Sequence, residues 1–436
     1  MNRPGAAESF DAVVRLFEAG QTIAAAEMCG RLLEKTPGDV SLRNMLGVIA
    51  AQEGRFADAA VCFRAVAAVA PDDPGVVTNL AQALLECGEH TEALALFRRA
   101  VGADLKLFRS GDLDVGKPAL DVPRIHRLND VTVETGYWAV LDGEKIYTRE
   151  TSNLNMVNSP AIKGRITTDR EFAVLSVPAI SQTIDEPCLF VGGDGNYAHW
   201  IYRYLMRLAA LDKRPGLAAL PLLVGDDIRP YEAASLAMAG FADNRLIRVP
   251  RRAAVRCRDI HLPVCLWSTP GRISHGIHWL RRRALEAGLV SPDPGTRRLF
   301  ISRRDAPSRK MTNEDEVVHA LAPLGFKSVE LSTLGFAEQV SLFGQAEIVV
   351  APHGAGLANI IFAPAACRLV ELVSDPIAHM SDIRVIQEAI GQRGMVVPCT
   401  SYEIYPGATH PMIQHSFRTE PADVVAAVET TLAGPG

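Results

Sequence analysis

The stretch EIVVAPHGAGLANIIFAP, residues 347–364, combines the residue types of an anion-binding site. A continuous apolar run, expected to form a buried strand, leads directly into a glycine-rich turn and a helix. Glycines let backbone amides approach a ligand, and the first turn of a helix presents unpaired N–H groups and the positive end of its dipole. The candidates for binding a diphosphate here are His353, Gly354, Ala355, Gly356 and Asn359. The alternative is a plain strand–turn–helix connection in which glycine serves packing.

A second stretch, residues 297–317, concentrates positive charge in a chain whose net charge is −5. Six of the fourteen residues from Arg297 to Lys310 are basic, and they follow a predicted strand. Guanidinium and ammonium groups at a strand end bind phosphates and offset charge on a departing diphosphate. The candidates in this loop and at the start of the following helix are Arg303, Arg304, Arg309, Lys310, Asn313 and Glu314. The alternative is a solvated basic loop.

The third stretch, VGGDGNYAHWIYRYLMRL at residues 191–208, contains Gly193-x-Gly195-x-x-Ala198 between a predicted strand and helix. This spacing is typical of dinucleotide binding, and Asp226 or Asp227 ends the next strand, where a ribose-binding acid would lie. The pattern makes an NAD(P) oxidoreductase the alternative function. Bulky side chains at the helix start and the lack of an evident dehydrogenase base argue against it.

The first hundred residues carry an internal repeat of 34 positions. The positions that repeat at this spacing are Gly20, Gly54 and Gly88, then Ala25, Ala59 and Ala93, then Phe63 and Phe97, and finally Pro37 and Pro71. This pattern resembles the tetratricopeptide repeat, a helix–turn–helix unit. Two well-formed repeats preceded by a degenerate one are expected to reach residue 104. Such an array could bind a partner or acceptor, or serve as a helical cap.

Beyond residue 185 the apolar runs alternate with helical patterns, which indicates parallel βαβ units. The segment SPDPGT, residues 291–296, divides them as a linker. The expected domains are therefore 1–104, a helical array; 105–290, a Rossmann-like half; and 297–436, a second Rossmann-like half. Open parallel sheets bind ligands beyond the carboxyl ends of their strands, so both halves are expected to direct loops into a shared cleft.

The order of residues from Leu299 to Leu372, including HGAGLAN and the preceding Glu338-Gln339, closely resembles glycosyltransferase family 61. This resemblance implies a GT-B-like pair of Rossmann-like domains and an inverting, metal-independent sugar transfer. The candidates named above in the second half would line the pocket of a nucleotide-sugar donor, UDP-linked and needing no other cofactor. Glu338 and Gln339 would support that pocket.

The same resemblance covers Asn-Tyr-x-His-Trp in the acceptor-side half and makes His199 the candidate general base, with Asp194 as second choice. Imidazole titrates near neutral pH, which suits removal of a proton from an acceptor hydroxyl. Members of the family often have an acid four residues after this histidine, where this chain has Arg203. Either another acid orients His199 or the base lies elsewhere.

The composition of the chain limits the kinds of site and the classes of protein that are expected. The chain has 436 residues, of which 48% are hydrophobic, and eight single cysteines without a C-x-x-C pair. No zinc site or dithiol redox site is indicated, and the acidic balance argues against nucleic-acid binding. No signal-like or membrane-spanning run is evident, so a cytoplasmic protein is expected, with peripheral association at the inner membrane left open. The expected partners are a nucleotide sugar, a glycan or protein acceptor and a protein bound by the repeats. A non-catalytic scaffold is the second alternative.

Overall fold

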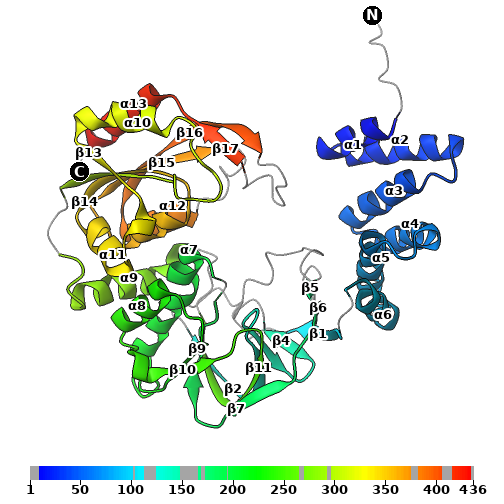
Figure 1. Cartoon of the computed structure of the whole chain (residues 1–436), viewed down its shortest axis with the longest axis horizontal. Coiled ribbons are helices and arrows are strands. Elements are labelled where there is room, and N and C mark those ends of the chain that lie inside the picture. Colours follow the sequence, from blue (N-terminus) through cyan, green and yellow to red (C-terminus); the bar gives the residue numbers. More distant parts are fainter. Residues whose placement is uncertain are drawn as a thin grey trace, which may run out of the picture. The chain divides into compact units, whose positions relative to one another are not determined.

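The computed structural model describes residues 9–101, 104–111, 124–147, 165–167, 172–193, 195–264, 270–291, 296–374, 382–404 and 415–433. The chain divides into two compact units. Unit 1 comprises residues 1–111, 141–149 and 153–179, and unit 2 comprises the remainder. Figure 1 gives the elements of each unit. The predicted boundaries at 104, 290 and 297 stay predictions, and most of the predicted linker lies outside the described residues.

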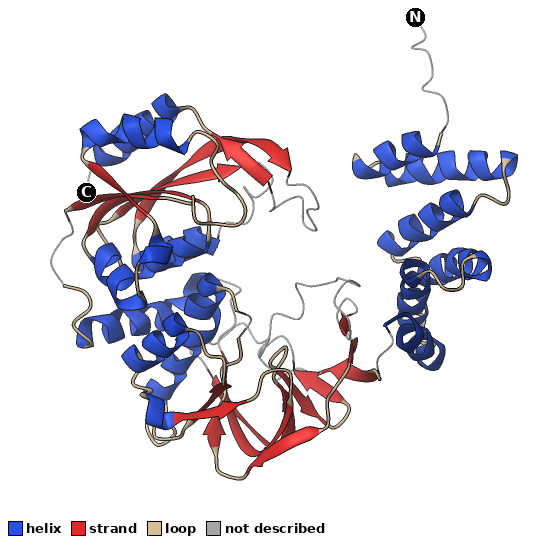
Figure 2. Ribbon diagram, in the orientation of Figure 1, coloured by secondary structure: helices blue, strands red, loops and turns tan. Residues whose placement is uncertain are grey.

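Unit 1 begins with three antiparallel helix pairs (Figure 2). The helices are α1 (Phe10–Glu18), α2 (Thr22–Lys35), α3 (Val40–Gln52), α4 (Phe56–Val69), α5 (Pro74–Glu86) and α6 (His90–Val101). Gly20, Gly54 and Gly88 stand between the helices of each pair with φ of +74°, +74° and +81°, a left-handed conformation that favours glycine. The 34-residue period therefore corresponds to one helix pair.

The strands of unit 1 continue the core of this array. They are β1 (Lys106–Ser110), β4 (Lys145–Tyr147), β5 (Arg165–Thr167) and β6 (Phe172–Leu175), in the order β4-β1-β6-β5. Leu105 and Val174 are buried with Phe63 and Phe97 in one apolar cluster. The strand β3 (Ala139–Asp142) lies where the chain passes from unit 2 into unit 1.

The first α/β half of unit 2 has a parallel sheet in the order β10-β9-β8-β11. Its elements are β2 (Arg124–Glu134), β7 (Ile180–Ile184), β8 (Cys188–Leu189), β9 (Leu222–Gly225), β10 (Leu246–Val249), β11 (Ala254–Val264), α8 (Pro230–Met238) and α9 (Pro270–Glu286). Numbered along the chain, the four parallel strands have the order 3-2-1-4 of a Rossmann fold. The long strand β2 pairs antiparallel with β11, and β7 pairs parallel with β11.

The predicted helix Tyr197–Leu211 differs in its winding. It consists of a single turn α7 (Tyr197–His199), a π-helix η2 (Trp200–Tyr204) and a 3₁₀ helix η3 (Leu205–Lys213). Trp200, Tyr202 and Tyr204 are all buried, although alternate positions of a helix face opposite sides. The segment is therefore enclosed by protein on both sides, and it changes its winding to place these rings. Short π segments of this kind often occur at functional sites.

The second half of unit 2 has five parallel strands and one antiparallel edge strand, in the order β13-β12-β14-β15-β16-β17. The strands are β12 (Arg297–Ile301), β13 (Phe326–Val329), β14 (Ala346–Pro352), β15 (Arg368–Ser374), β16 (Arg393–Ile404) and β17 (His415–Arg418). The helices are α10 (Glu314–Leu321), α11 (Phe336–Gly344), α12 (Asp382–Ile390), α13 (Pro421–Ala433) and the 3₁₀ helices η5 (Ala322–Leu324), η6 (Leu331–Thr333) and η7 (Ala355–Phe362).

Helices cover both faces of this second sheet (Figure 1). Alternate residues of its strands enter two separate apolar clusters, because successive side chains of a strand point to opposite faces. Phe300 packs with α10 and α13, whereas Leu299 and Ile301 pack with α11, η7 and α12. That second cluster also contains Trp200, Leu205 and Leu280 of the first half, so the two halves share one core. The predicted fold class, a helical array followed by paired Rossmann-like halves, is confirmed.

Candidate functional site

The predicted donor-site residues follow two neighbouring strands of the second sheet. Along the chain, its parallel strands have the order 2-1-3-4-5, and β12 and β14 are the first and third strands. Connections leave in opposite directions at this point, which opens a crevice at the carboxyl ends of the two strands. The basic loop follows β12, and His353 with Gly354 follows β14. The topology therefore brings the two sequence-predicted stretches together.

Arg303 and Gly354 are in direct contact. The guanidinium of Arg303 donates from Nη2 to the carbonyl of Ser308 at 2.9 Å and from Nε to that of Arg309 at 3.2 Å. A Cβ atom at Gly354 would overlap with Nη1 of Arg303. A side chain at this position would have to displace the guanidinium of Arg303. The guanidinium of Arg303, which belongs to the loop after β12, thus lies against the HGAG turn.

His353 has a carboxylate partner that the sequence reasoning missed. Nδ1 of His353 lies 2.7 Å from Oε1 of Glu371, whose side chain is 3% exposed. In the register of β14 and β15, Glu371 lies opposite Ala351, two residues before His353, and the His353 N–H donates to the carbonyl of Leu372 at 2.9 Å. When Nδ1–H is donated to Glu371, Nε2 is the ring nitrogen that meets a ligand. The signal was present: Glu371 is the charged residue within the apolar run from Leu369 to Val373.

Arg309 is a partly buried cation that pairs with no carboxylate among the described residues. Its Nε atom is buried and has no hydrogen-bond partner within the described part of the chain. Burial lowers the pKa of the Arg309 guanidinium below its usual value. Its backbone has a φ of +54°, which is uncommon for a residue other than glycine. Partial desolvation of a guanidinium that has no carboxylate partner favours a negatively charged ligand, so Arg309 stays a candidate for donor binding.

Glu314 and Arg304 are engaged with the protein itself. Oε1 of Glu314 accepts from the hydroxyl of Ser302 at 2.6 Å, and Oε2 accepts from the N–H of Arg303 at 3.2 Å. Arg304 forms ion pairs with Glu314 and Asp315 and is half exposed. These contacts hold the loop after β12 against the start of α10.

Asn313 and Lys310 attach this loop to β17. Nδ2 of the buried Asn313 donates to the carbonyl of Thr419 at 2.8 Å, and Asn313 precedes the first turn of α10. The carbonyl of Lys310 accepts from the N–H of Phe417 at 3.0 Å, while the Lys310 side chain is exposed. Both residues therefore fix the shape of the basic loop, and Lys310 also leaves an ammonium at its surface.

Asn359 joins the two halves of unit 2. It is fully buried, and its Oδ1 accepts from the hydroxyl of Tyr197 at 2.6 Å. Its Nδ2 donates to Oε1 of Gln339 at 2.9 Å and to the carbonyl of Gly356 at 3.1 Å. Burial raises the pKa of the Tyr197 phenol well above its usual value, so the phenol remains a neutral donor. These contacts favour a positioning role for Asn359 and explain how Gln339 supports the turn. Ala355 and Gly356 begin η7 beside them.

This contact predicts a stability effect. Tyr197→Phe is expected to lower the free energy of unfolding by about 1–2 kcal/mol, because Oδ1 of the buried Asn359 loses its donor. Urea unfolding followed by circular dichroism measures the change. Tyr147→Phe is the control, since it removes a phenol hydroxyl in unit 1, where the contact with Asp142 is a longer 3.4 Å. Equal losses in the two variants would contradict the proposed link between the halves.

His199 lies in the first half, in the same short turn as Tyr197. Its N–H donates to Oδ1 of Asn196 at 3.2 Å, and its ring meets that of Tyr202 edge-on at 6.1 Å. The guanidinium of Arg203 lies 5.8 Å from the Tyr202 ring. Asp194, the second candidate for the base, lies outside the described residues. Because α7 contacts η7, His199 is brought to the same part of unit 2 as the HGAG turn.

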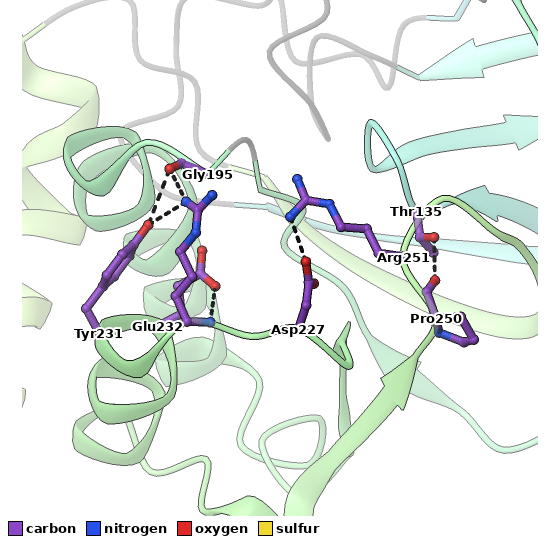
Figure 3. A network of polar contacts seen from close by, with 8 residues as sticks. Thr135, Gly195, Asp227, Tyr231, Glu232, Pro250 and Arg251 are labelled. Atoms are coloured by element: carbon purple, nitrogen blue, oxygen red, sulfur yellow. Dashed lines mark hydrogen bonds and ion pairs between the residues drawn. The ribbon is translucent and has the colours of Figure 1, made fainter. Parts of the chain in front are cut away.

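Gly193 and Gly195 of the predicted dinucleotide-binding pattern line a pocket at the ends of β8 and β9, whereas Ala198 does not. Arg229 donates from Nη1 to the carbonyl of Gly195 and, at 2.9 Å, contacts the hydroxyl of Tyr231. Arg251 donates to Asp227 at 2.8 Å (Figure 3). Burial raises the pKa of the Glu232 carboxyl in the same pocket, even though the Arg229 N–H donates to it at 2.9 Å.

Comparison with protein families identifies the domain that contains these residues. A family model described as Glycosyltransferase 61 matches residues 197–370, which include His199, Arg303, His353 and Asn359. The chain carries a glycosyltransferase 61 domain. Two tetratricopeptide repeat models match residues 5–74 and 50–106, so the helical array of unit 1 is a tetratricopeptide array.

Curated relatives match parts of this chain. Beta-1,2-xylosyltransferase XAX1 of Oryza sativa subsp. japonica is 30% identical over 141 residues, which are 32% of this chain and 24% of that protein. EGF domain-specific O-linked N-acetylglucosamine transferase of Mus musculus is 33% identical over 86 residues, 19% of this chain and 16% of that protein. The chain thus matches a quarter or less of the length of these relatives.

Solved structures match about a fifth of the chain. The MamA RS-1 ArsTM double mutant has 19% sequence identity and a TM-score of 0.20, and the match covers 21% of this chain and 51% of that one. The first TPR of Spaghetti (RPAP3) bound to the HSP90 peptide SRMEEVD has 14% identity and a TM-score of 0.21, covering 21% and 73%. Among the described residues, every helix is too short or too polar to span a bilayer.

Proposed function

We propose that this chain is an inverting glycosyltransferase that moves a sugar from a nucleotide-sugar donor, UDP-linked, to a hydroxyl of a glycan or protein acceptor. The glycosyltransferase 61 domain supports transfer of a sugar, and the names of the relatives describe such transfers. One observation carries the donor assignment: Arg309, whose Nε is buried, has no carboxylate partner among the described residues and lies in the loop that also brings Arg303 to Gly354. A diphosphate supplies the missing negative charge.

The proposed transfer uses both halves of unit 2. A base, for which His199 remains the candidate with Asp194 as the second, takes the proton of the acceptor hydroxyl. The hydroxyl oxygen attacks the anomeric carbon from the side opposite the diphosphate, the bond from that carbon to the phosphate oxygen breaks, and the configuration inverts. The departing diphosphate carries the negative charge, which Arg303, Arg309 and His353 stabilise. No step requires a metal ion.

A ligand screen on the purified full chain tests this proposal. Calorimetry with UDP, GDP, NAD and a set of UDP-sugars is expected to show binding of UDP and of at least one UDP-sugar, and no binding of NAD. Proton NMR of the transfer or hydrolysis product then reports the configuration of the anomeric carbon. Binding of NAD alone would favour the oxidoreductase alternative. Binding of a nucleotide sugar without hydrolysis or transfer would favour the scaffold.

Gly354→Ala tests the contact between the two donor stretches. The added methyl group overlaps with Nη1 of Arg303 and is expected to displace its guanidinium, which weakens UDP binding about tenfold. Calorimetry measures the change. Gly335→Ala is the control, because a Cβ atom there meets Glu338 at an ordinary 3.4 Å. Unchanged affinity in Gly354→Ala would remove Arg303 from the proposed donor pocket.

The tetratricopeptide array is proposed to bind a protein partner or the acceptor. Four large apolar side chains on its described helices are exposed: Ile23, Val61, Val69 and Phe10 are 72%, 69%, 69% and 38% accessible. Exposed apolar residues on a repeat array are available for such contacts.

A further inference from the structure

The pocket at the ends of β8 and β9 contains an aromatic side chain that the donor site does not use. Trp138 lies beside two glycines of the pocket: a Cβ atom at Gly193 would lie 3.4 Å from its Nε1, and one at Gly225 would lie 3.4 Å from its Cζ2. Side chains at these glycines would crowd the indole. Within the described part of the chain, the indole N–H donates no hydrogen bond. The pocket therefore presents a half-buried aromatic ring together with an available donor.

The turn that carries Trp138 is held in a strained conformation. Trp138 has a φ of +56°, an outlier for a bulky side chain. The buried Glu134 accepts from the N–H groups of Gly136 and Tyr137, both at 2.9 Å. Thr135, also buried, donates from its hydroxyl to the carbonyl of Pro250 at 2.6 Å (Figure 3). The neighbouring contacts thus determine where the indole lies, and such strain is commonly kept where it serves a site.

Charged groups with planar hydrogen-bonding ends line the rest of this pocket. Arg251 and Asp227 form an ion pair across its mouth, and both are about half exposed. Arg229 and Glu232 are attached to each other through the Arg229 N–H and extend the polar lining. Both signs of charge are present, so the pocket is not specialised for an anion. It offers both hydrogen-bond donors and acceptors beside one aromatic side chain.

We infer that this pocket is a subsite for a pyranose ring of the acceptor, with Trp138 stacking on the C–H face of the sugar and Asp227, Arg251 and Arg229 bonding its hydroxyl groups. Sugar rings have one apolar C–H face and an equatorial belt of hydroxyls, which matches an aromatic platform bordered by charged planar groups. The inference rests on the proposed function and extends it, since it assigns acceptor chemistry to the first half while the donor occupies the second.

The test uses saturation-transfer NMR on the full chain. The probes are the methyl glycosides of xylose, glucose, N-acetylglucosamine, galactose and mannose and their disaccharides. Binding of at least one probe through its ring C–H protons is expected. Trp138→Ala is expected to weaken that binding about tenfold, and Trp138→Phe, which keeps an aromatic face, is expected to retain most of it. Asp227→Asn, which preserves the shape of the pocket, is expected to weaken it as well. Thermal melting verifies that each variant folds.

Parallel titration with UDP separates the two proposals. The three variants are expected to bind UDP as the unmodified chain does, because their side chains lie in the other half. Failure of UDP to bind the unmodified chain would count against the proposed donor, whatever the glycosides do. The subsite is wrong if no probe binds the unmodified chain, or if a probe binds Trp138→Ala and Asp227→Asn with unchanged affinity.

Discussion

Replacing His353 with alanine is expected to lower kcat/KM for sugar transfer by about 10²–10³-fold, the usual cost of removing one donor that stabilises developing charge. Nδ1 of His353 is held 2.7 Å from the buried Glu371, which leaves Nε2 as the ring nitrogen for a ligand. Its contact with the leaving diphosphate strengthens as negative charge develops. We therefore expect the loss mainly in kcat, with a smaller loss in UDP affinity. Steady-state kinetics and calorimetry together measure this division.

Two further variants support the His353 result. Glu371→Gln retains a hydrogen-bond acceptor for Nδ1 but removes the buried charge, and it is expected to lower kcat about tenfold. His319→Ala removes an exposed histidine on α10 and is expected to leave kcat unchanged. If His353→Ala transfers sugar at the original rate, the diphosphate does not lie at the HGAG turn.

The second large effect concerns Arg309. Arg309→Met is expected to weaken UDP binding roughly 100-fold, because the bound diphosphate loses a desolvated guanidinium. The same variant is expected to be as stable as the original chain or more stable, since burial of an unpaired cation opposes folding. Loss of binding with stability retained or increased is the combination that distinguishes a ligand site from a structural ion pair. Calorimetry and thermal melting measure the two quantities.

Arg304→Ala is the matched control from the same loop. Arg304 is half exposed and pairs with Glu314 and Asp315, so its removal is expected to change UDP affinity less than about threefold. Arg309→Lys retains the charge without the planar fork and is expected to restore only part of the affinity. A clear loss of stability in Arg309→Met without loss of UDP binding would assign Arg309 a structural role.

Much of the fold followed from local patterns. The period of 34 residues predicted the helix pairs because each repeat places glycine where the chain takes a positive φ, as Gly20, Gly54 and Gly88 do. Apolar runs bounded by turns predicted the strands of the second half, including β14 and β15, since a buried parallel strand is apolar on both faces. The winding of residues 197–213 was not predictable in this way, because it depends on aromatic rings that pack on both sides.

The candidate site was predicted in part. The residue types of the HGAG turn and the basic loop indicated an anion site, and the strand order brought Arg303 against Gly354. Asn359 was predicted to line the donor pocket, yet its polar atoms bond Tyr197, Gln339 and Gly356. No local pattern indicated Trp138 as a site residue, because the glycines that it touches are far from it along the chain.

The sequence by itself determined which chemistry was available: repeats at one end, and histidine, arginine and glycine at strand ends in the other half. These properties are local, because they depend on residue type and on spacing within a few turns of chain. Only the tertiary structure decided which charges are paired. Arg304 meets Glu314 and Asp315, and His353 meets Glu371. Arg309, whose Nε is buried, meets no carboxylate among the described residues. Pairing and desolvation depend on distance in space, and these determine which of several basic residues are adapted to bind an anion.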